Sequence, residues 1–276
     1  MLYAIDLPNF GDYGDPRVLA DLAGEAEQHG WDGFFIWDHI IAGAMPVADT
    51  TVTLAAIALG THRIRFGPMV IPLPRRSPWT VAREALTLDH LSNGRLILGI
   101  GAGGDWFAEL TTFGLAVNDA VRAEQLDEGL TILAALVSGK EAALQGKHYM
   151  VEPTRFFPMP IQQRIPIWIA ARWPRLRPFR RAAKYDGVAP VSADIEADLT
   201  VQQTREVHAL IAKFRMSTTP FDIIQFGTTD GRSHEDARKV AGFAEAGATW
   251  WLEAPNPWKS TIAQVRERIR FGPPKI

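Results

Sequence analysis

Residues 64–109 have the sequence IRFGPMVIPLPRRSPWTVAREALTLDHLSNGRLILGIGAGGDWFAE, and this stretch decides the fold. Its first nine residues, 64–72, are mostly apolar and typical of a buried strand that ends in a bulge or turn. Ser77-Pro78 then begins a helix with a serine N-cap and a first-turn proline, and Asn93-Gly94 ends it with a left-handed cap. Residues 95–101 form the next apolar strand, which leads into a glycine-rich loop. The stretch is therefore one complete β-α-β unit.

The same alternation of strand and helix continues on both sides of this unit. Six further strands are predicted at residues 2–7, 33–37, 165–170, 186–191, 221–226 and 249–253, nearly all separated by segments with helical spacing of apolar residues. Eight strands in 276 residues predict an α/β fold, a (β/α)₈ TIM barrel that forms a single domain over residues 1–276. Between the fourth and fifth strands, residues 139–163 are predicted to be an irregular insertion, with 149–151 and 155–157 as short strand candidates.

Composition limits the classes of function. The formal net charge of -2 gives no electrostatic reason to expect nucleic acid or an anionic membrane as a partner. The chain has no cysteine, which excludes disulfides and thiolate chemistry. The N-terminal residues lack the features of a signal peptide, and no apolar run is long enough to span a bilayer. We therefore expect a cytoplasmic protein.

In barrels of this kind the active site lies at the carboxyl ends of the strands. His39 follows the second strand directly and is the best candidate for proton transfer, because imidazole titrates near neutral pH. The alternative is a histidine packed at the barrel rim. Asp38 either orients His39 or caps the following segment. Glu109 follows the glycine loop and can point back toward the mouth, although a solvated surface glutamate is the simpler interpretation.

Residues 99–104, with the sequence GIGAGG, match the dinucleotide-binding fingerprint GxGxxG. A Rossmann unit also needs a second parallel strand that ends in an acidic residue, and here a long helix and an irregular segment follow instead. We interpret the glycines as a barrel loop in which the backbone can approach a ligand closely.

Two arginines, Arg172 and Arg175, follow the fifth strand and are candidates for binding a phosphate or carboxylate. The histidines show no HxH or HExxH spacing, and there is no Gly-x-Ser-x-Gly turn or P-loop lysine. Metal and serine-nucleophile chemistry are therefore not predicted.

Several segments together resemble the bacterial luciferase-like superfamily of flavin- and deazaflavin-dependent oxidoreductases. The most specific is LDHLSNGRLILGIGAG at residues 88–103, and GFFIWDH at residues 33–39 is the second. Further segments occur in the family's order and cover most of the chain: Glu109 with Phe113-Gly114, and residues 166–170, 183–187 and 247–251.

The resemblance implies a (β/α)₈ barrel with a deazaflavin (coenzyme F-420) or FMN in its mouth. His39, Glu109 and Asp38 are then the catalytic residues. The implied cofactor-binding residues are Met69 and Val70 in a strand bulge where many members have a cis peptide, Ala102, Gly103 and Gly104 beside the ring, and Ala170, Ala171, Arg172 and Trp173 near the phosphate.

The resemblance also implies an oxidoreductase in which the reduced cofactor transfers a hydride to, or oxygenates, a small organic substrate. Two alternatives remain open: an FMN-dependent luciferase-like monooxygenase proper, and a barrel that binds flavin without catalysis. Family members are often dimers, so a homodimer is also implied.

Overall fold

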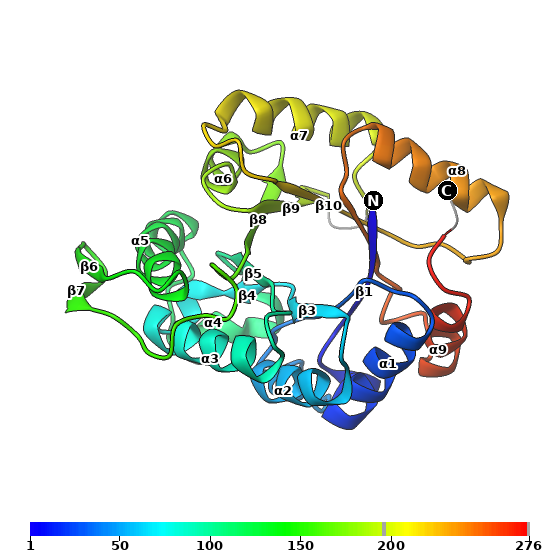
Figure 1. Cartoon of the computed structure of the whole chain (residues 1–276), viewed down its shortest axis with the longest axis horizontal. Coiled ribbons are helices and arrows are strands. Elements are labelled where there is room, and N and C mark those ends of the chain that lie inside the picture. The colour runs from blue at the N-terminus through cyan, green and yellow to red at the C-terminus, as the bar shows by residue number, and fades with distance from the viewer. Residues whose placement is uncertain (195–196, 275–276) are drawn as a thin grey trace.

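The computed structural model describes residues 1–194 and 197–274, and its central feature is a parallel sheet that curves into a barrel (Figure 1). In the described part of the chain, the strands of this sheet lie in the order β3-β2-β1-β11-β10-β9-β8-β5-β4. Their bounds are β1 (Leu2–Leu7), β2 (Gly33–Ile36), β3 (Arg65–Pro68), β4 (Ile71–Pro72), β5 (Leu98–Gly101), β8 (Ile167–Trp173), β9 (Gly187–Ser192), β10 (Asp222–Gly227) and β11 (Trp250–Glu253). The predicted TIM barrel is confirmed.

The two ends of this sheet, β3 and β4, are halves of one predicted strand. Met69 and Val70 separate them, and the peptide bond between these two residues is cis. β3 pairs with β2, β4 pairs with β5, and a parallel bridge from Phe66 to Leu96 brings β3 beside the start of β5. The interrupted strand therefore closes the barrel.

Helices form the outer layer, as Figure 1 shows. The longer ones are α1 (Pro16–Gln28), α2 (Thr50–Gly60), α3 (Pro78–Leu91), α5 (Asp119–Val137), α6 (Leu176–Ala182), α7 (Val201–Phe214), α8 (His234–Glu245) and α9 (Ile262–Arg270). Short helical turns, η1 (Gly11–Tyr13), η2 (Leu73–Arg75), η3 (Trp106–Ala108) and α4 (Glu109–Thr112), lie in the connections. Among the described residues, no helix has the length and apolar character to cross a membrane.

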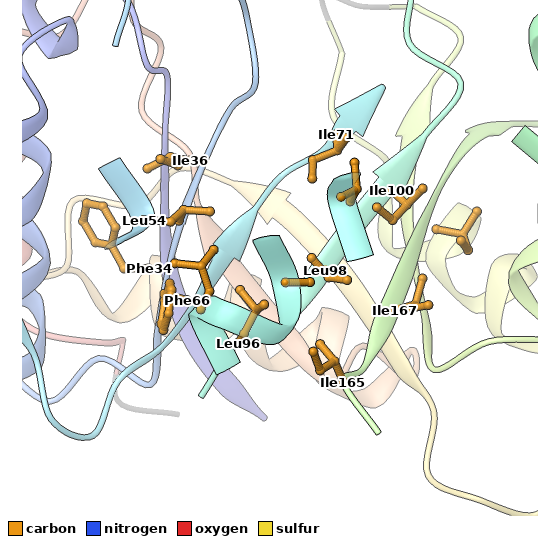
Figure 2. Close-up of a cluster of buried hydrophobic side chains, with 14 of the residues drawn as sticks. Phe34, Ile36, Leu54, Phe66, Ile71, Leu96, Leu98, Ile100, Ile165 and Ile167 are labelled. Atoms are coloured by element: carbon orange, nitrogen blue, oxygen red, sulfur yellow. The ribbon is translucent and has the colours of Figure 1, made fainter. Parts of the chain in front are cut away.

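The main hydrophobic core lies between the strands and the helices. Figure 2 shows part of it, in which outward-facing strand side chains such as Phe34, Phe66 and Ile100 gather with Leu54 of α2. A second cluster fills the barrel interior and includes Ala4, Phe35, Trp168, Trp250 and Leu252. Because side chains alternate along a strand, these positions identify which residues of each strand face inward.

The insertion between the fourth and fifth barrel strands contains an antiparallel hairpin, β6 (Ala142–Gln145) and β7 (Met150–Thr154), which projects from one edge in Figure 1. Residues 149–151 overlap β7, but the strand predicted at 155–157 is wrong. The true partner, β6, begins a short turn after the end of α5. β7 pairs with β6 through residue 154, and the chain then turns away to Pro158, whose bond to Phe157 is cis.

Candidate active site at the barrel mouth

His39 lies at the rim of the barrel, just past the end of β2, and its imidazole contacts the side chain of Glu109. Nδ1 of His39 is 3.1 Å from Oε2 of Glu109, a contact between residues 70 positions apart in sequence. An ionised carboxylate has no proton to donate, so Nδ1 of His39 is the donor. Within the described part of the chain, Nε2 of His39 makes no hydrogen bond or ion pair. That nitrogen is free to exchange a proton with a bound molecule.

The environment of Glu109 keeps it ionised. Burial by itself would raise the pKa of this carboxyl. Hydrogen bonds from His39 and from the backbone N–H of Ile40, at 2.6 Å, together with the charge of Arg75, outweigh that effect and hold the pKa of Glu109 below its ordinary value. Glu109 is thus a fixed acceptor that orients His39.

Arg75, the last residue of η2, joins Glu109 to Asp38. Its Nη1 is 3.3 Å from Oε1 of Glu109, and its Nη2 is 2.9 Å from Oδ2 of Asp38 and 2.6 Å from the Asp38 carbonyl oxygen. The Arg75 side chain is only 4% exposed. Two buried carboxylates therefore share one buried guanidinium. Arg75 was not among the predicted site residues, because nothing in the sequence distinguishes it from Arg76.

Asn9 fixes the main chain of His39 through hydrogen bonds. Its side-chain amide donates to the carbonyl oxygens of His39 and Ala48, both at 2.8 Å, and its Oδ1 accepts from the N–H of His39 at 3.1 Å. Asn9 is completely buried at the end of β1. The imidazole is consequently fixed through both its ring and its main chain.

Aromatic rings cover the imidazole. The ring centroids of Phe10 and Phe107 lie 5.4 and 5.3 Å from that of His39, both edge-on, and Trp37 lies at 6.0 Å. Trp258 packs against Phe10 and Phe107 in turn. These rings limit the exposure of the His39 side chain to 16%. They create an apolar, water-poor surrounding for the one free imidazole nitrogen.

Phe10 also lines a cavity of about 140 Å³. The other lining residues come from η1, from the loop before α2 and from the loop after β11: Gly11, Asp12, Tyr13, Met45, Pro257 and Trp258. Phe10 thus contacts the imidazole and also forms part of an adjoining space that has both polar and apolar lining.

The glycines of the GxGxxG segment pack against the interrupted strand. A Cβ on Gly99 would lie 2.3 Å from the Pro68 carbonyl oxygen, and one on Gly101 would lie 2.9 Å from Cγ2 of Val70. Gly103 has a φ of +69° beside Pro72. The sequence predicted that these glycines let the backbone approach a ligand. At Gly99 and Gly101, they instead let β5 approach the bulge between β3 and β4. Ala102 and Gly104 are half-buried in the same loop.

Strand β8 presents the remaining predicted residues alternately. Trp168 faces the barrel interior, so Ala170 and Arg172 face the same way toward the mouth. Ala171 is buried in the outer core, and Trp173 packs on Phe179 of α6 with ring centroids 5.7 Å apart. The side chains of Ala171 and Trp173 therefore lie away from the mouth, where only their backbone can contribute.

Arg172 and Arg175, at and after the end of β8, differ in their interactions with neighbouring residues. Arg172 makes no side-chain hydrogen bond or ion pair with the described residues. Arg175 is 63% exposed and lies 3.5 Å from Asp119. Of the two arginines predicted to bind an anion, Arg172 is the one on the inward-facing side of the barrel. No group of three or more histidines or carboxylates in the described ranges is arranged to hold a metal ion.

Known proteins with similar sequences include an F420-dependent glucose-6-phosphate dehydrogenase of Nakamurella multipartita. It is 31% identical over 166 residues, which cover 58% of this chain and 48% of the relative. An uncharacterized protein of Mycobacterium tuberculosis is 28% identical over 214 residues, covering 70% of this chain and 73% of that protein. This chain thus matches about half the length of the dehydrogenase.

Solved structures show the same fold at low sequence identity. An F420-dependent secondary alcohol dehydrogenase in complex with an F420-acetone adduct has a TM-score of 0.78 and 14% identity, covering 98% of this chain and 97% of that one. The monooxygenase RslO1 from Streptomyces bottropensis has a TM-score of 0.72 and 18% identity over the same shares. Residues 5–272 match the family described as luciferase-like monooxygenase, and the chain belongs to that family.

Proposed function

We propose that this protein is an oxidoreductase that binds a reduced deazaflavin or FMN at the barrel mouth and transfers a hydride to a small organic substrate. The observation that carries the proposal is the state of His39. Its Nδ1 is held by the ionised Glu109 and its Nε2 is free, within an apolar surrounding at the carboxyl ends of the strands. Membership of the luciferase-like family and the names of its F420-dependent relatives support the choice of cofactor.

The residues at the mouth fit a planar heterocycle. Gly101 and Ala170 leave a wall of small side chains beside Val70. Asp6 has a buried carboxylate oxygen without a hydrogen-bond partner in the described part of the chain. Arg172 supplies an inward-facing cation that suits the phosphate common to both cofactors. When bound, either cofactor supplies a hydride, which the twenty amino-acid side chains cannot.

Residues of the chain itself would donate the proton that the reaction needs. Reduction of a carbonyl to an alcohol needs one hydride at carbon and one proton at oxygen. Because Nδ1–H is bonded to Glu109, Nε2 of His39 would give that proton from the imidazolium form, in which both ring nitrogens carry hydrogen. The ionised Glu109 would stabilise the imidazolium that holds the proton before transfer, as a carboxylate does for a catalytic histidine. Arg75 and Asp38 would keep Glu109 in position, and the rings of Phe10 and Phe107 would exclude water from the transfer.

The first test is binding followed by single-turnover reduction. Purified protein is titrated with the deazaflavin and with FMN, followed by fluorescence, and the tight complex is then reduced and mixed with a panel of small aldehydes and ketones. In the absence of oxygen, we expect oxidation of the reduced cofactor only when a carbonyl compound is present. Binding of neither cofactor would overturn the proposal. Tight FMN binding with consumption of oxygen and substrate would favour the monooxygenase alternative instead.

The second test isolates His39. We expect His39→Gln to lower the rate of single-turnover reduction by about 10²- to 10⁴-fold, the usual contribution of a general acid, while cofactor affinity changes little. His29→Gln is the matched control, because the His29 side chain bonds the Glu25 carbonyl oxygen at the end of α1, in the outer layer. An unchanged rate in His39→Gln would remove His39 from the chemistry and leave the binding proposal intact.

A further inference from the structure

In the described part of the barrel interior, a tryptophan indole donates to an aspartate carboxylate in two places, to Asp6, which is buried, and to Asp222, which is partly buried. At the amino-terminal end of the barrel, Nε1 of Trp168 donates to Oδ2 of Asp222 at 3.1 Å. At the carboxyl-terminal end, Nε1 of Trp37 donates to Oδ2 of Asp6 at 3.0 Å. The two pairs use the same chemistry at opposite ends of one barrel, so their second carboxylate oxygens can be compared directly.

The pair at the amino-terminal end is complete. Oδ1 of Asp222 accepts from the hydroxyl of Thr249 at 3.0 Å, so both oxygens of this aspartate have donors. The pair at the mouth is not complete. Oδ1 of Asp6 is buried and has no hydrogen-bond partner among the described residues. Asp6 is 3% exposed, and a buried polar atom left without a partner costs about 1–3 kcal/mol.

Asp6 lies on the inward side of β1, in the last interior position before that strand ends. Ala4, two residues earlier, belongs to the barrel-interior cluster, and side chains alternate along a strand. Phe35 on β2 and Leu252 on β11 face the same space, and Trp37, just past the end of β2, reaches Asp6 through its indole. Asp6 therefore lies beneath the mouth, on the same side of the sheet as the space that we assign to the cofactor.

The charged groups on the adjacent strands are directed elsewhere. Asp38 and His39 lie beyond the end of β2 and are bound to Arg75 and Glu109. On β11, Glu253 pairs with Arg268 in the outer layer at 3.0 Å. Burial raises the pKa of Asp6 to about 8, only partly offset by the Trp37 hydrogen bond. At neutral pH this side chain is a carboxylic acid, with Oδ2 accepting from the indole and Oδ1 available to carry the proton.

We propose that Asp6 is a cofactor-binding residue, which donates a hydrogen bond from its carboxylic acid to a carbonyl oxygen of the heterocyclic ring seated in the mouth. The inference rests on the proposed function and adds a specific contact to it. Oxidised flavin and deazaflavin rings share a pyrimidinedione with such carbonyl groups, so the contact suits either cofactor. Met69, a flexible side chain in the same interior cluster, can shift as the ring enters.

The experiment compares two substitutions of similar size by fluorescence titration with the oxidised deazaflavin and with FMN. Asp6→Asn keeps an N–H donor and an acceptor for Trp37, whereas Asp6→Leu keeps neither. We expect Asp6→Asn to bind within about threefold of wild type, and Asp6→Leu to bind about tenfold more weakly, the equivalent of one hydrogen bond. Asp222→Asn, in the complete pair at the other end of the barrel, is the matched control and should bind like wild type.

A pH series separates donation to the cofactor from simple support of Trp37. Above about pH 8 the ionised Asp6 still accepts from the indole but can no longer donate, and it faces a carbonyl oxygen with a negative charge. We expect wild-type affinity to fall through that range and Asp6→Asn affinity to follow only the cofactor's own titration. The infrared C=O stretch of a protonated carboxyl, absent in Asp6→Asn, should shift on binding.

The outcomes distinguish this inference from the proposed function. Wild-type protein that binds neither cofactor overturns both. Wild-type protein that binds a cofactor, with Asp6→Leu binding equally well, overturns the role of Asp6 alone. The same conclusion follows if Asp6→Leu binds weakly but wild type and Asp6→Asn share one pH profile, because Asp6 would then act only by holding Trp37. Thermal unfolding of each variant confirms that the protein compared is folded.

Discussion

At the scale of single residues, the site depends on a charge that the sequence does not reveal. His39 and Glu109 were predicted because they follow the ends of strands, and the structure brings them into contact at 3.1 Å. Arg75 has no such signal: it precedes a second arginine in a loop, and only the fold buries one and leaves the other near the surface. Asp6 had a weaker signal, a single carboxylate in the apolar strand LYAIDL.

Removal of Arg75 should destabilise the protein strongly. Arg75→Met leaves Asp38 and Glu109 as buried carboxylates without their shared cation, and breaking a buried ion pair typically costs about 3–5 kcal/mol. The neighbouring Arg76 is the control, because its pair with Glu84 is more exposed and its removal should cost about 1 kcal/mol or less. The free energy of unfolding in urea at pH 7 measures both. If both variants lost the same free energy of unfolding, the buried cluster would contribute no more to stability than the exposed pair.

At the scale of elements, the glycine-rich segment shows why a motif alone is ambiguous. The sequence correctly places a strand and a glycine loop at this point, but a glycine is required wherever any backbone or side chain comes close. For Gly99 and Gly101, the close neighbours are Pro68, the last residue of β3, and Val70, which lies in the break between β3 and β4. The partner of a strand is a property of the closed sheet, so the sequence of β5 could not identify it.

A methyl group at Gly101 should therefore be costly even without a ligand. In Gly101→Ala the new Cβ would lie 2.9 Å from Cγ2 of Val70 and 3.2 Å from Cβ of Ala170. Overpacking of this kind costs about 1–3 kcal/mol. Gly60→Ala is the control, since a Cβ there meets no atom within 4 Å. Unfolding by denaturant, measured without cofactor, should show Gly101→Ala to be less stable than Gly60→Ala. Equal stability would mean that Val70 and the bulge move aside at no cost in free energy.

At the scale of the whole molecule, the barrel could be predicted because the sequence pattern of each element is local. Each strand and helix has its own spacing of apolar residues and its own end signals. The pairing within the insertion could not be predicted in the same way. Residues 155–157 have the apolar composition of a strand, yet β7 pairs with β6 instead. The sequence of β6 has only a weak strand pattern. Closure of the barrel likewise depends on a long-range bridge, between Phe66 and Leu96.

Global stability should also record the protonation of Asp6. Burial raises its folded-state pKa from 3.8 to about 8, so between these values the folded protein holds a proton that the unfolded chain releases. The unfolded state then binds fewer protons, and stability must fall as pH rises from about 4 to about 8. At ~1.36 kcal/mol per pKa unit, the upper limit of this loss is on the order of 6 kcal/mol.

Asp6→Asn isolates that contribution, because it retains the Trp37 hydrogen bond but cannot ionise. Glu109, whose pKa is lowered, acts in the opposite sense: its contribution is present above the unfolded pKa and is lost as pH falls. Since Glu109 is common to both proteins, it cancels in their difference. Urea unfolding at a series of pH values from 4.5 to about 8.5 should show wild type losing stability relative to Asp6→Asn. A constant difference across the series would mean that Asp6 is already ionised in the folded barrel.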